Sequence, residues 1–185
     1  AIDIGAMIGD TLIPIATAVG RSGHTIAFEM GPLPFETLEY QRLMNPEYKF
    51  TLFNKAVSDS PRRVRYNTGC QGCNGGIDPN VGVLVDAVRL VPFVSQQLGE
   101  DVLRNVSFIK IDTEGHDVTI LRDLKPFLED QHPVLWIEWF AKYRHGPENE
   151  CSPESLELFK VIESIGYTAR TPRDTPLDGC QNSNW

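Results

Sequence analysis

The sequence feature that most constrains the fold is a short apolar strand that runs into a glycine-rich turn and then into a helix. The strand is Ile2–Ile4, and residues 10–19 carry an apolar side typical of a helix. Gly5 lets the chain turn tightly, and Gly9 lets the helix start approach a ligand with no Cβ in between. Free N–H groups at such a helix start favour polar or anionic ligand atoms. The alternative interpretation is a plain tight turn between a strand and a helix.

Strand-like and helix-like segments alternate along the rest of the chain, which predicts an α/β domain with a mostly parallel sheet. Strands are expected at residues 24–29, 49–57, 83–91, 106–112 and 134–138, and a last edge strand is expected to begin at Tyr167. Helices are expected at residues 34–44, 94–103, 117–124 and 153–165. Residues 67–83 lack periodicity and are expected to form a long loop, either functional or disordered. Ligands of such sheets bind beyond the carboxyl ends of the strands, so functional side chains should follow each strand.

The length and composition fit one domain with a substantial core. The chain has 185 residues, and 41% of them are hydrophobic. We expect residues 1–185 to form a single domain that is excised from, or slightly truncated relative to, a longer chain, because the sequence starts inside a strand. Further domains of that longer chain are candidate partners.

The charge and hydropathy patterns exclude two classes of partner. The net charge is −8, and nucleic-acid binders usually carry a basic face. The one basic cluster, Arg62, Arg63 and Arg65, is expected to be a solvated strand or turn. No stretch reaches the roughly 18 apolar residues that a transmembrane helix needs, and no signal peptide opens the chain. We therefore expect no nucleic-acid partner and no membrane span.

The four cysteines are too few for a disulfide scaffold in a chain of this length, which favours a reducing compartment and a cytoplasmic location. Cys70 and Cys73 have C-x-x-C spacing, but a zinc site needs two more ligands. Cys151 and Cys180 are available, but neither lies in a second such pair. Free thiols on a glycine-rich loop are the favoured interpretation.

Glu29 ends the second expected strand and is the next candidate for ligand binding. An acid at the tip of this strand is suited to accept hydrogen bonds from both hydroxyls of a ribose. A solvated surface glutamate is the alternative. Together, the glycine turn and this acid are much more specific than either is alone.

Four stretches of the chain occur in the order seen in the FkbM-type methyltransferase family. They are Asp3 to Gly9, Ala27-Phe28-Glu29, Asn54 to Asp59, and Phe108-Ile109-Lys110-Ile111-Asp112-Thr113-Glu114-Gly115, and the D-x-G-x-x-x-G spacing of the first is typical of methyltransferases. The chain resembles this family over about residues 2–140, and Ile137-Glu138 resembles a later family strand. It departs from the family at Met7, where the family usually has Asn, and at Met30-Gly31, where it usually has Pro-Asn.

This resemblance implies a Rossmann-like class I methyltransferase fold, with a mostly parallel sheet flanked by helices on both faces. It also implies an S-adenosylmethionine-dependent O-methyltransferase that acts on a hydroxyl of a sugar, a glycan or a small natural product. The cofactor contacts it implies are Asp3, Gly5, Ala6, Gly9, Glu29, Ser58, Asp59 and Asp112. Ser58 and Asp59 would lie near the adenine, although these residue types also favour simple turns.

The segment after the strand at residues 106–112 carries the candidate catalytic groups Asp112, Glu114 and His116. Methyl transfer from a sulfonium is an in-line displacement, so the enzyme must align the hydroxyl and remove its proton. Asp112 or Glu114 is expected to act as the base or to orient the acceptor, with His116 as an alternative base. Asp117 is expected only to cap the following helix.

Residues near the next strand are candidates for binding the acceptor. Glu138, Trp139 and Tyr143 are expected to line its pocket, whereas Trp136 is expected in the core. Asp112, Glu114 and Glu138 also offer hard oxygen ligands for a divalent metal, but the sequence does not demand one and no metal is predicted.

Two other functions stay open: an NAD-dependent oxidoreductase, and a non-catalytic Rossmann-like module of a larger protein.

Overall fold

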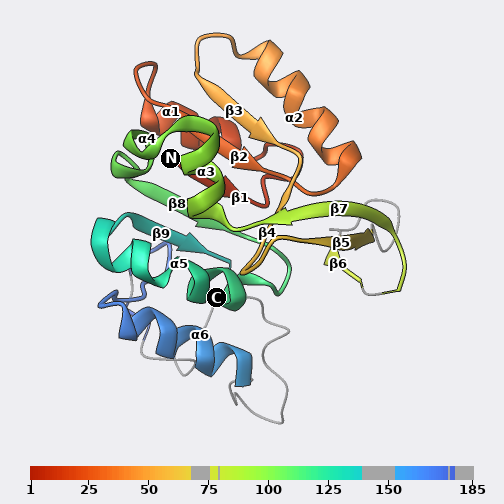
Figure 1. The fold of residues 1–185 in the computed structure, drawn as a ribbon. Coiled ribbons are helices and arrows are strands. Elements are labelled where there is room, and N and C mark those ends of the chain that lie inside the picture. Colours follow the sequence, from red (N-terminus) through yellow and green to blue (C-terminus); the bar gives the residue numbers. More distant parts are fainter. Residues whose placement is uncertain (68–75, 79, 139–152, 175, 178–185) are drawn as a thin grey trace.

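A five-stranded parallel sheet forms the centre of the molecule, with strand order β3-β2-β1-β8-β9 (Figure 1). The computed structural model describes residues 1–67, 76–78, 80–138, 153–174 and 176–177. The strands of this sheet are β1 (Ile2–Ile4), β2 (Thr25–Phe28), β3 (Phe50–Phe53), β8 (Phe108–Ile111) and β9 (Val134–Ile137). The predicted α/β architecture with a mostly parallel sheet is confirmed.

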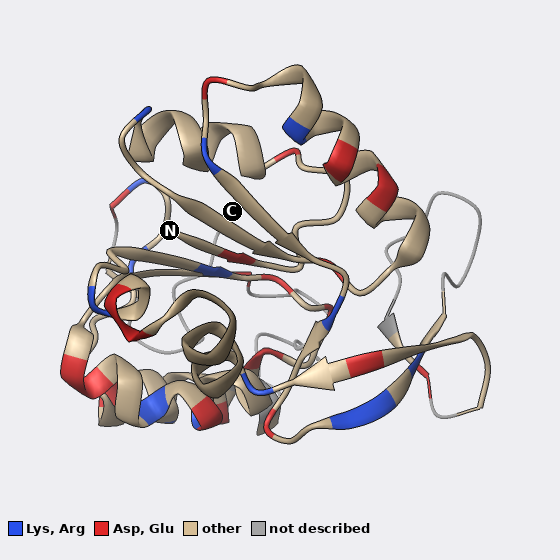
Figure 2. Ribbon diagram, turned by 45° about the horizontal axis from the view of Figure 1, so that its top comes forward, with Lys and Arg blue, Asp and Glu red and all other residues tan. Residues whose placement is uncertain are grey.

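Helices cover both faces of this sheet, as predicted (Figures 1 and 2). One face is covered by α1 (Leu12–Val19) and α2 (Pro32–Met44), which pack on Ala27 and Leu52. The other face carries the main core, built on Ile2 and Ile4 and their neighbours in register. The helices packed against it are α3 (Leu90–Leu98), α4 (Glu100–Arg104), α5 (Asp117–Gln131) and α6 (Pro153–Ser164).

A second, smaller sheet extends from the carboxyl-end side of the first and was not predicted (Figure 1). Its strand order is β4-β7-β5-β6, and its strands are β4 (Ala56–Val57), β7 (Val83–Val88), β5 (Arg62–Asn67) and β6 (Gly76–Ile77). The single strand expected at residues 49–57 is therefore wrong, because the chain leaves the first sheet at Asn54. The Asn54 Nδ2 donates to the backbone oxygens of Glu29 and Met30, at 2.9 and 3.2 Å, and fixes this bend.

Two predicted helix boundaries also differ from the structure. The helix expected at residues 94–103 is two helices, and the chain breaks at Gly99 because its φ of 88° is incompatible with a continuous right-handed helix. The helix expected at residues 117–124 continues through Pro126 to Gln131, because its apolar face packs in the main core as far as Leu128.

Two predictions at the far edge of the sheet are wrong. No strand begins at Tyr167, whose hydroxyl instead donates to the backbone oxygen of Pro133 at 2.7 Å. Trp136 is 48% exposed and is not a core residue. Its register partner is Lys110, so it lies on the face that α1 and α2 cover, and those two helices pack over β2 and β3 rather than over β9.

Charges of both signs are spread over the surface (Figure 2). The basic segment of β5 lies beside Asp86 of β7, which pairs with Lys55 at 2.8 Å and lies 3.9 Å from Arg63. Arg62, Arg63 and Arg65 are all exposed, as predicted for a solvated strand. No helix in the described part of the chain has the length and apolar character needed to cross a membrane.

Substitution of Gly5 by Ala is expected to cost more stability than the same change at Gly20, although both have a φ of 80°. A Cβ on Gly5 would lie 1.7 Å from the backbone oxygen of Asp112, whereas a Cβ on Gly20 would meet nothing within 4 Å. The unfavourable backbone alone costs about 1–3 kcal/mol. Gly20→Ala should stay in that range in urea unfolding and Gly5→Ala should exceed it; equal losses would contradict the close contact between β1 and β8.

Candidate functional site

A pocket opens at the carboxyl ends of β1, β2 and β8, where ligands of parallel α/β sheets bind. Its walls come from both sheets. The lining residues are Ile4, Gly5, Met7, Phe28, Glu29, Met30, Pro34, Lys55, Ala56, Val57, Tyr66, Ile77, Asp112, Thr113, Glu114 and His116. The pocket therefore has an acidic rim along the first sheet and an apolar wall from the second.

Glu29 and the glycine turn face this same pocket. The Glu29 carboxylate accepts hydrogen bonds from the backbone N–H of Met7 at 2.8 Å and of Gly31 at 2.6 Å. Burial raises the pKa of Glu29, while these two amide hydrogen bonds oppose the rise by stabilising the carboxylate. The turn itself is tied to β2, because the N–H groups of Gly5 and Ala6 both donate to the backbone oxygen of Phe28.

Met7 shows why a departure from the family pattern is tolerated. Its φ is 47°, a left-handed conformation that Asn adopts more readily than Met. The contact with Glu29 is made by the backbone N–H of Met7, which every residue except proline has. The substitution at this position therefore leaves the connection between the turn and Glu29 intact.

Lys110 contacts two residues that line the pocket, Gly5 and Asp112, and the sequence analysis missed it. It stands within the most characteristic stretch of the resemblance. It is buried, and its Nζ contacts the backbone oxygen of Gly5 at 3.1 Å, Asp3 Oδ1 at 3.3 Å and Asp112 Oδ2 at 3.2 Å. Burial opposes its charge, but the carboxylates of Asp3 and Asp112 outweigh this and raise the pKa of Lys110. A lysine inside an otherwise apolar strand is the sequence pattern that could have indicated this role.

Asp3 is the buried partner of this lysine rather than a lining residue. Its side chain is fully buried, and it accepts a hydrogen bond from Thr11 Oγ1 at 3.0 Å. Burial raises the pKa of Asp3, against the lowering effect of Lys110 and Thr11. Asp3 thus joins the glycine turn to the strand that carries the candidate catalytic groups.

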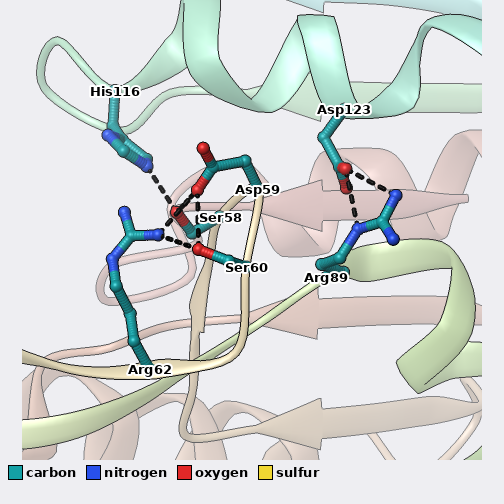
Figure 3. A network of polar contacts seen from close by, with 7 residues as sticks. All are labelled: Ser58, Asp59, Ser60, Arg62, Arg89, His116 and Asp123. Atoms are coloured by element: carbon teal, nitrogen blue, oxygen red, sulfur yellow. Dashed lines mark hydrogen bonds and ion pairs between the residues drawn. The ribbon is translucent and has the colours of Figure 1, made fainter.

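A polar network joins the end of β4 to the loop before α5 (Figure 3). Ser58 Oγ lies 2.9 Å from His116 Nε2 and donates to Asp59 Oδ1 at 3.1 Å. Asp59 also accepts from Arg62 at 2.6 Å, and this hydrogen bond is the main reason that the pKa of Asp59 falls to about 2. Burial, aided by the nearby cation of Arg62, lowers the pKa of His116, so its ring is neutral at pH 7.

Three carboxylates converge at the end of β8 and β9. Oxygens of Asp112, Glu114 and Glu138 all lie within 4.8 Å of one another. Burial raises the pKa of Glu138 to about 8, with further contributions from the hydrogen bond and charge of Asp112. Such a group can hold a shared proton or, with hard oxygen ligands, a divalent cation.

Asp117 organises the loop that carries these acids. It is buried, and its carboxylate accepts hydrogen bonds from the backbone N–H groups of Thr113 at 3.0 Å and Gly115 at 3.1 Å. Glu114 lies between them with a φ of 57°. These contacts tie the loop to the start of α5, but they bond N–H groups that precede the helix, and no side chain among the described residues caps its N-terminus. The expected role of Asp117 as a cap of the following helix is therefore wrong, because its carboxylate turns back to the loop.

The structure brings together only some of the predicted site residues. Those that line the pocket are Gly5, Glu29, Asp112, Glu114 and His116. Those that lie outside its lining are Asp3, Ala6, Gly9, Ser58, Asp59 and Glu138. Trp139, Tyr143 and all four cysteines, with the zinc alternative they raised, fall outside the described residues.

Gly9 and Ala6 face the helices rather than the pocket. A Cβ on Gly9 would lie 3.1 Å from Leu38 Cδ2 and 3.2 Å from Gln41 Cγ, both on α2. Ala6 is buried in the same cluster as Leu38. A space constraint from α2 therefore explains the glycine at position 9 without a ligand, and cofactor contacts of these two residues stay a prediction.

Comparison with solved structures identifies the class of fold as that of a methyltransferase. The crystal structure of Methyltransferase FkbM from Methylobacillus flagellatus KT superposes with a TM-score of 0.59 at 20% sequence identity. The match covers 89% of this chain and 36% of that one, so the chain spans about a third of the length of that protein. A search of curated proteins gives no match.

The family model for the methyltransferase FkbM domain matches residues 3–168. The chain belongs to this family, which confirms the resemblance seen in the sequence and supports a methyltransferase function.

Substitution of Lys110 by Met is expected to lower the free energy of unfolding by about 3–5 kcal/mol, because it leaves the buried carboxylate of Asp3 without its cation. The half-buried carboxylate of Asp112 also loses its partner. The matched control, Lys125→Met, removes a lysine whose side chain is 41% exposed and should cost less than about 1 kcal/mol. Both are measured by urea unfolding at pH 7. Equal losses would contradict the structural role of Lys110.

The pH dependence of the Lys110→Met variant follows from the raised pKa of Asp3. Burial raises this pKa above its unfolded value, and loss of the cation raises it further. The folded variant then binds a proton more readily than the unfolded chain. The loss in its free energy of unfolding relative to the wild type is therefore largest at neutral pH, and this loss is the deficit. The deficit should shrink as the pH falls toward about 4; a deficit that grows on acidification would contradict this assignment.

Substitution of Asp112 by Asn is expected to lower the pKa of Glu138 below about 8, because it removes a negative charge and a coupled carboxyl group. Burial keeps that pKa above the ordinary value of a glutamate. The measurement is a pH titration of the carboxyl ¹³C resonances by NMR. An unchanged pKa would show that Asp112 does not contribute to the raised pKa of Glu138.

Proposed function

We propose that this chain binds S-adenosylmethionine and transfers its methyl group to a hydroxyl of a sugar, a glycan or a small natural product. The observation that supports this most is that the glycine turn and Glu29 face one pocket and are joined by a hydrogen bond. An extended adenosyl ligand needs such a pair of contacts, one for its amino-acid end and one for its ribose. Membership of the FkbM family is in keeping with this assignment.

The pocket offers different chemistry for each part of that cofactor. Glu29 supplies the acceptor for the ribose hydroxyls. Ala56 and Val57 of β4 supply an apolar surface for the adenine, close to Ser58 and Asp59. The amino-acid end would lie by Gly5 and the turn, and the sulfonium would face the segment from Asp112 to His116.

The candidate base is a carboxylate of that segment. Displacement at the methyl group needs an oxygen nucleophile in line with the sulfonium, and a nearby carboxylate can take the proton of the hydroxyl. Asp112 and Glu114 both line the pocket. Asp112 also forms an ion pair with Lys110. His116 is neutral at pH 7, but its Nε2 is engaged with Ser58, which favours a carboxylate over the imidazole.

The acceptor would enter from the side of Glu138 and the second sheet. Glu138 lies beside Asp112, and Ile77 of β6 adds apolar surface to the wall. From the sequence alone, Trp139 and Tyr143 are also proposed to contact the acceptor. The acids at this end would suit the hydroxyl groups of a polar acceptor through hydrogen bonds.

The experiment that tests the proposal is a thermal-shift titration with S-adenosylhomocysteine and with NAD. At about 100 times its dissociation constant a ligand stabilises the protein by about 2.7 kcal/mol. Stabilisation by S-adenosylhomocysteine is expected and stabilisation by NAD is not. A response to NAD alone, or to neither ligand, overturns the proposal.

Glu29→Gln should weaken S-adenosylhomocysteine binding by at least about tenfold, because hydrogen bonds to a charged group contribute about 1.5–3 kcal/mol. The matched control is Glu36→Gln, at an exposed position of α2, and it should bind as the wild type does. Isothermal titration calorimetry measures both. If Glu29→Gln binds as tightly as wild type, Glu29 has no role at the ribose.

A further inference from the structure

Tyr66 brings a polar group from the second sheet into the pocket. It lies on the inward face of β5, where it packs with Ala56, Val85 and Ala87 in the small core of that sheet. Only 5% of its surface is exposed, yet it lines the pocket that Glu29 lines. Its ring is therefore held in place by a hydrophobic cluster that is separate from the main core.

The end of the Tyr66 ring lies against Gly31, next to Glu29. A Cβ on Gly31 would lie 2.7 Å from both Cζ and the hydroxyl oxygen of Tyr66, and 3.0 Å from Glu29 Oε1. The N–H of Gly31 donates to that same Glu29 oxygen at 2.6 Å. The phenol thus occupies the space that a side chain at position 31 would fill, and this space adjoins the Glu29 carboxylate.

The phenol of Tyr66 can supply a hydrogen-bond donor, which the ionised carboxylate of Glu29 lacks. Glu29 only accepts hydrogen bonds when ionised, whereas a phenol both donates and accepts. Burial, together with the negative charge of Glu29, raises the pKa of Tyr66, so the hydroxyl keeps its proton at neutral pH. In the part of the chain that the structure describes, no residue hydrogen-bonds this hydroxyl.

We propose that the Tyr66 hydroxyl, which occupies the space left by the missing side chain of Gly31, binds the ribose of the cofactor beside Glu29. The inference rests on the proposed function, because it needs an adenosyl ligand in this pocket. Glu29 and Tyr66 then hold the diol from two different sheets. The donor–acceptor capacity of the phenol matches a hydroxyl, which also both donates and accepts.

The test is isothermal titration calorimetry of Tyr66→Phe with S-adenosylhomocysteine and with its 2′-deoxy and 3′-deoxy analogues. Loss of one hydrogen bond should weaken S-adenosylhomocysteine binding about fivefold to tenfold. Binding of at least one deoxy analogue should change by less than about twofold, because the partner of the phenol is then already absent. Phe keeps the ring in the small core, so the unfolding midpoint of the ligand-free protein should not fall.

The controls separate this inference from the proposed function. Tyr40→Phe, on the exposed face of α2, should bind all three ligands as the wild type does. If the wild type binds and Glu29→Gln binds weakly but Tyr66→Phe is unaffected, the proposed function stands and the role of Tyr66 is overturned. An equal loss for all three ligands also overturns it, since Tyr66 would then act only through packing. If the wild type binds none of the three, both proposals fail.

Discussion

The rest of the site depends on one buried cation between two neighbouring strands. Lys110 of β8 lies in register with Asp3 of β1, so the two charges meet on the same face of the sheet. The same ammonium group reaches the backbone of Gly5 and the carboxylate of Asp112. A buried lysine is tolerated only when its charge is compensated. The network that compensates it also fixes the glycine turn relative to the candidate catalytic segment.

The pocket is completed by a part of the molecule with a separate core. The first sheet supplies the turn, Glu29 and the acidic segment, whereas the second supplies the wall from Tyr66 and Ile77. The chain passes between the sheets at Asn54, whose side chain bonds the backbone just after β2. One bend therefore sets the distance between Glu29 and the wall that faces it.

The sequence predicted the features that depend on local pattern. The parallel sheet, the helices on both faces, and the pairing of Glu29 with the glycine turn follow from periodicity and motif order. It could not predict the second sheet, because β4 and β6 have only two residues each, and β4 pairs with β7, where Ala56 lies opposite the distant Ala87. Nor could it predict that Trp136 is exposed or that Gly9 faces α2, because both depend on which helix covers which strand.

The missing side chain of Gly31 has a consequence for comparing relatives. On this backbone, a Cβ at position 31 and the phenol of Tyr66 cannot share the same space. Members of the family with the more usual Asn at position 31 must have a different side chain at the position of Tyr66, or their strand β5 must be shifted. The identities of these two residues are therefore expected to change together, which makes the pair a marker for a subgroup of the family that can be read from sequence alone.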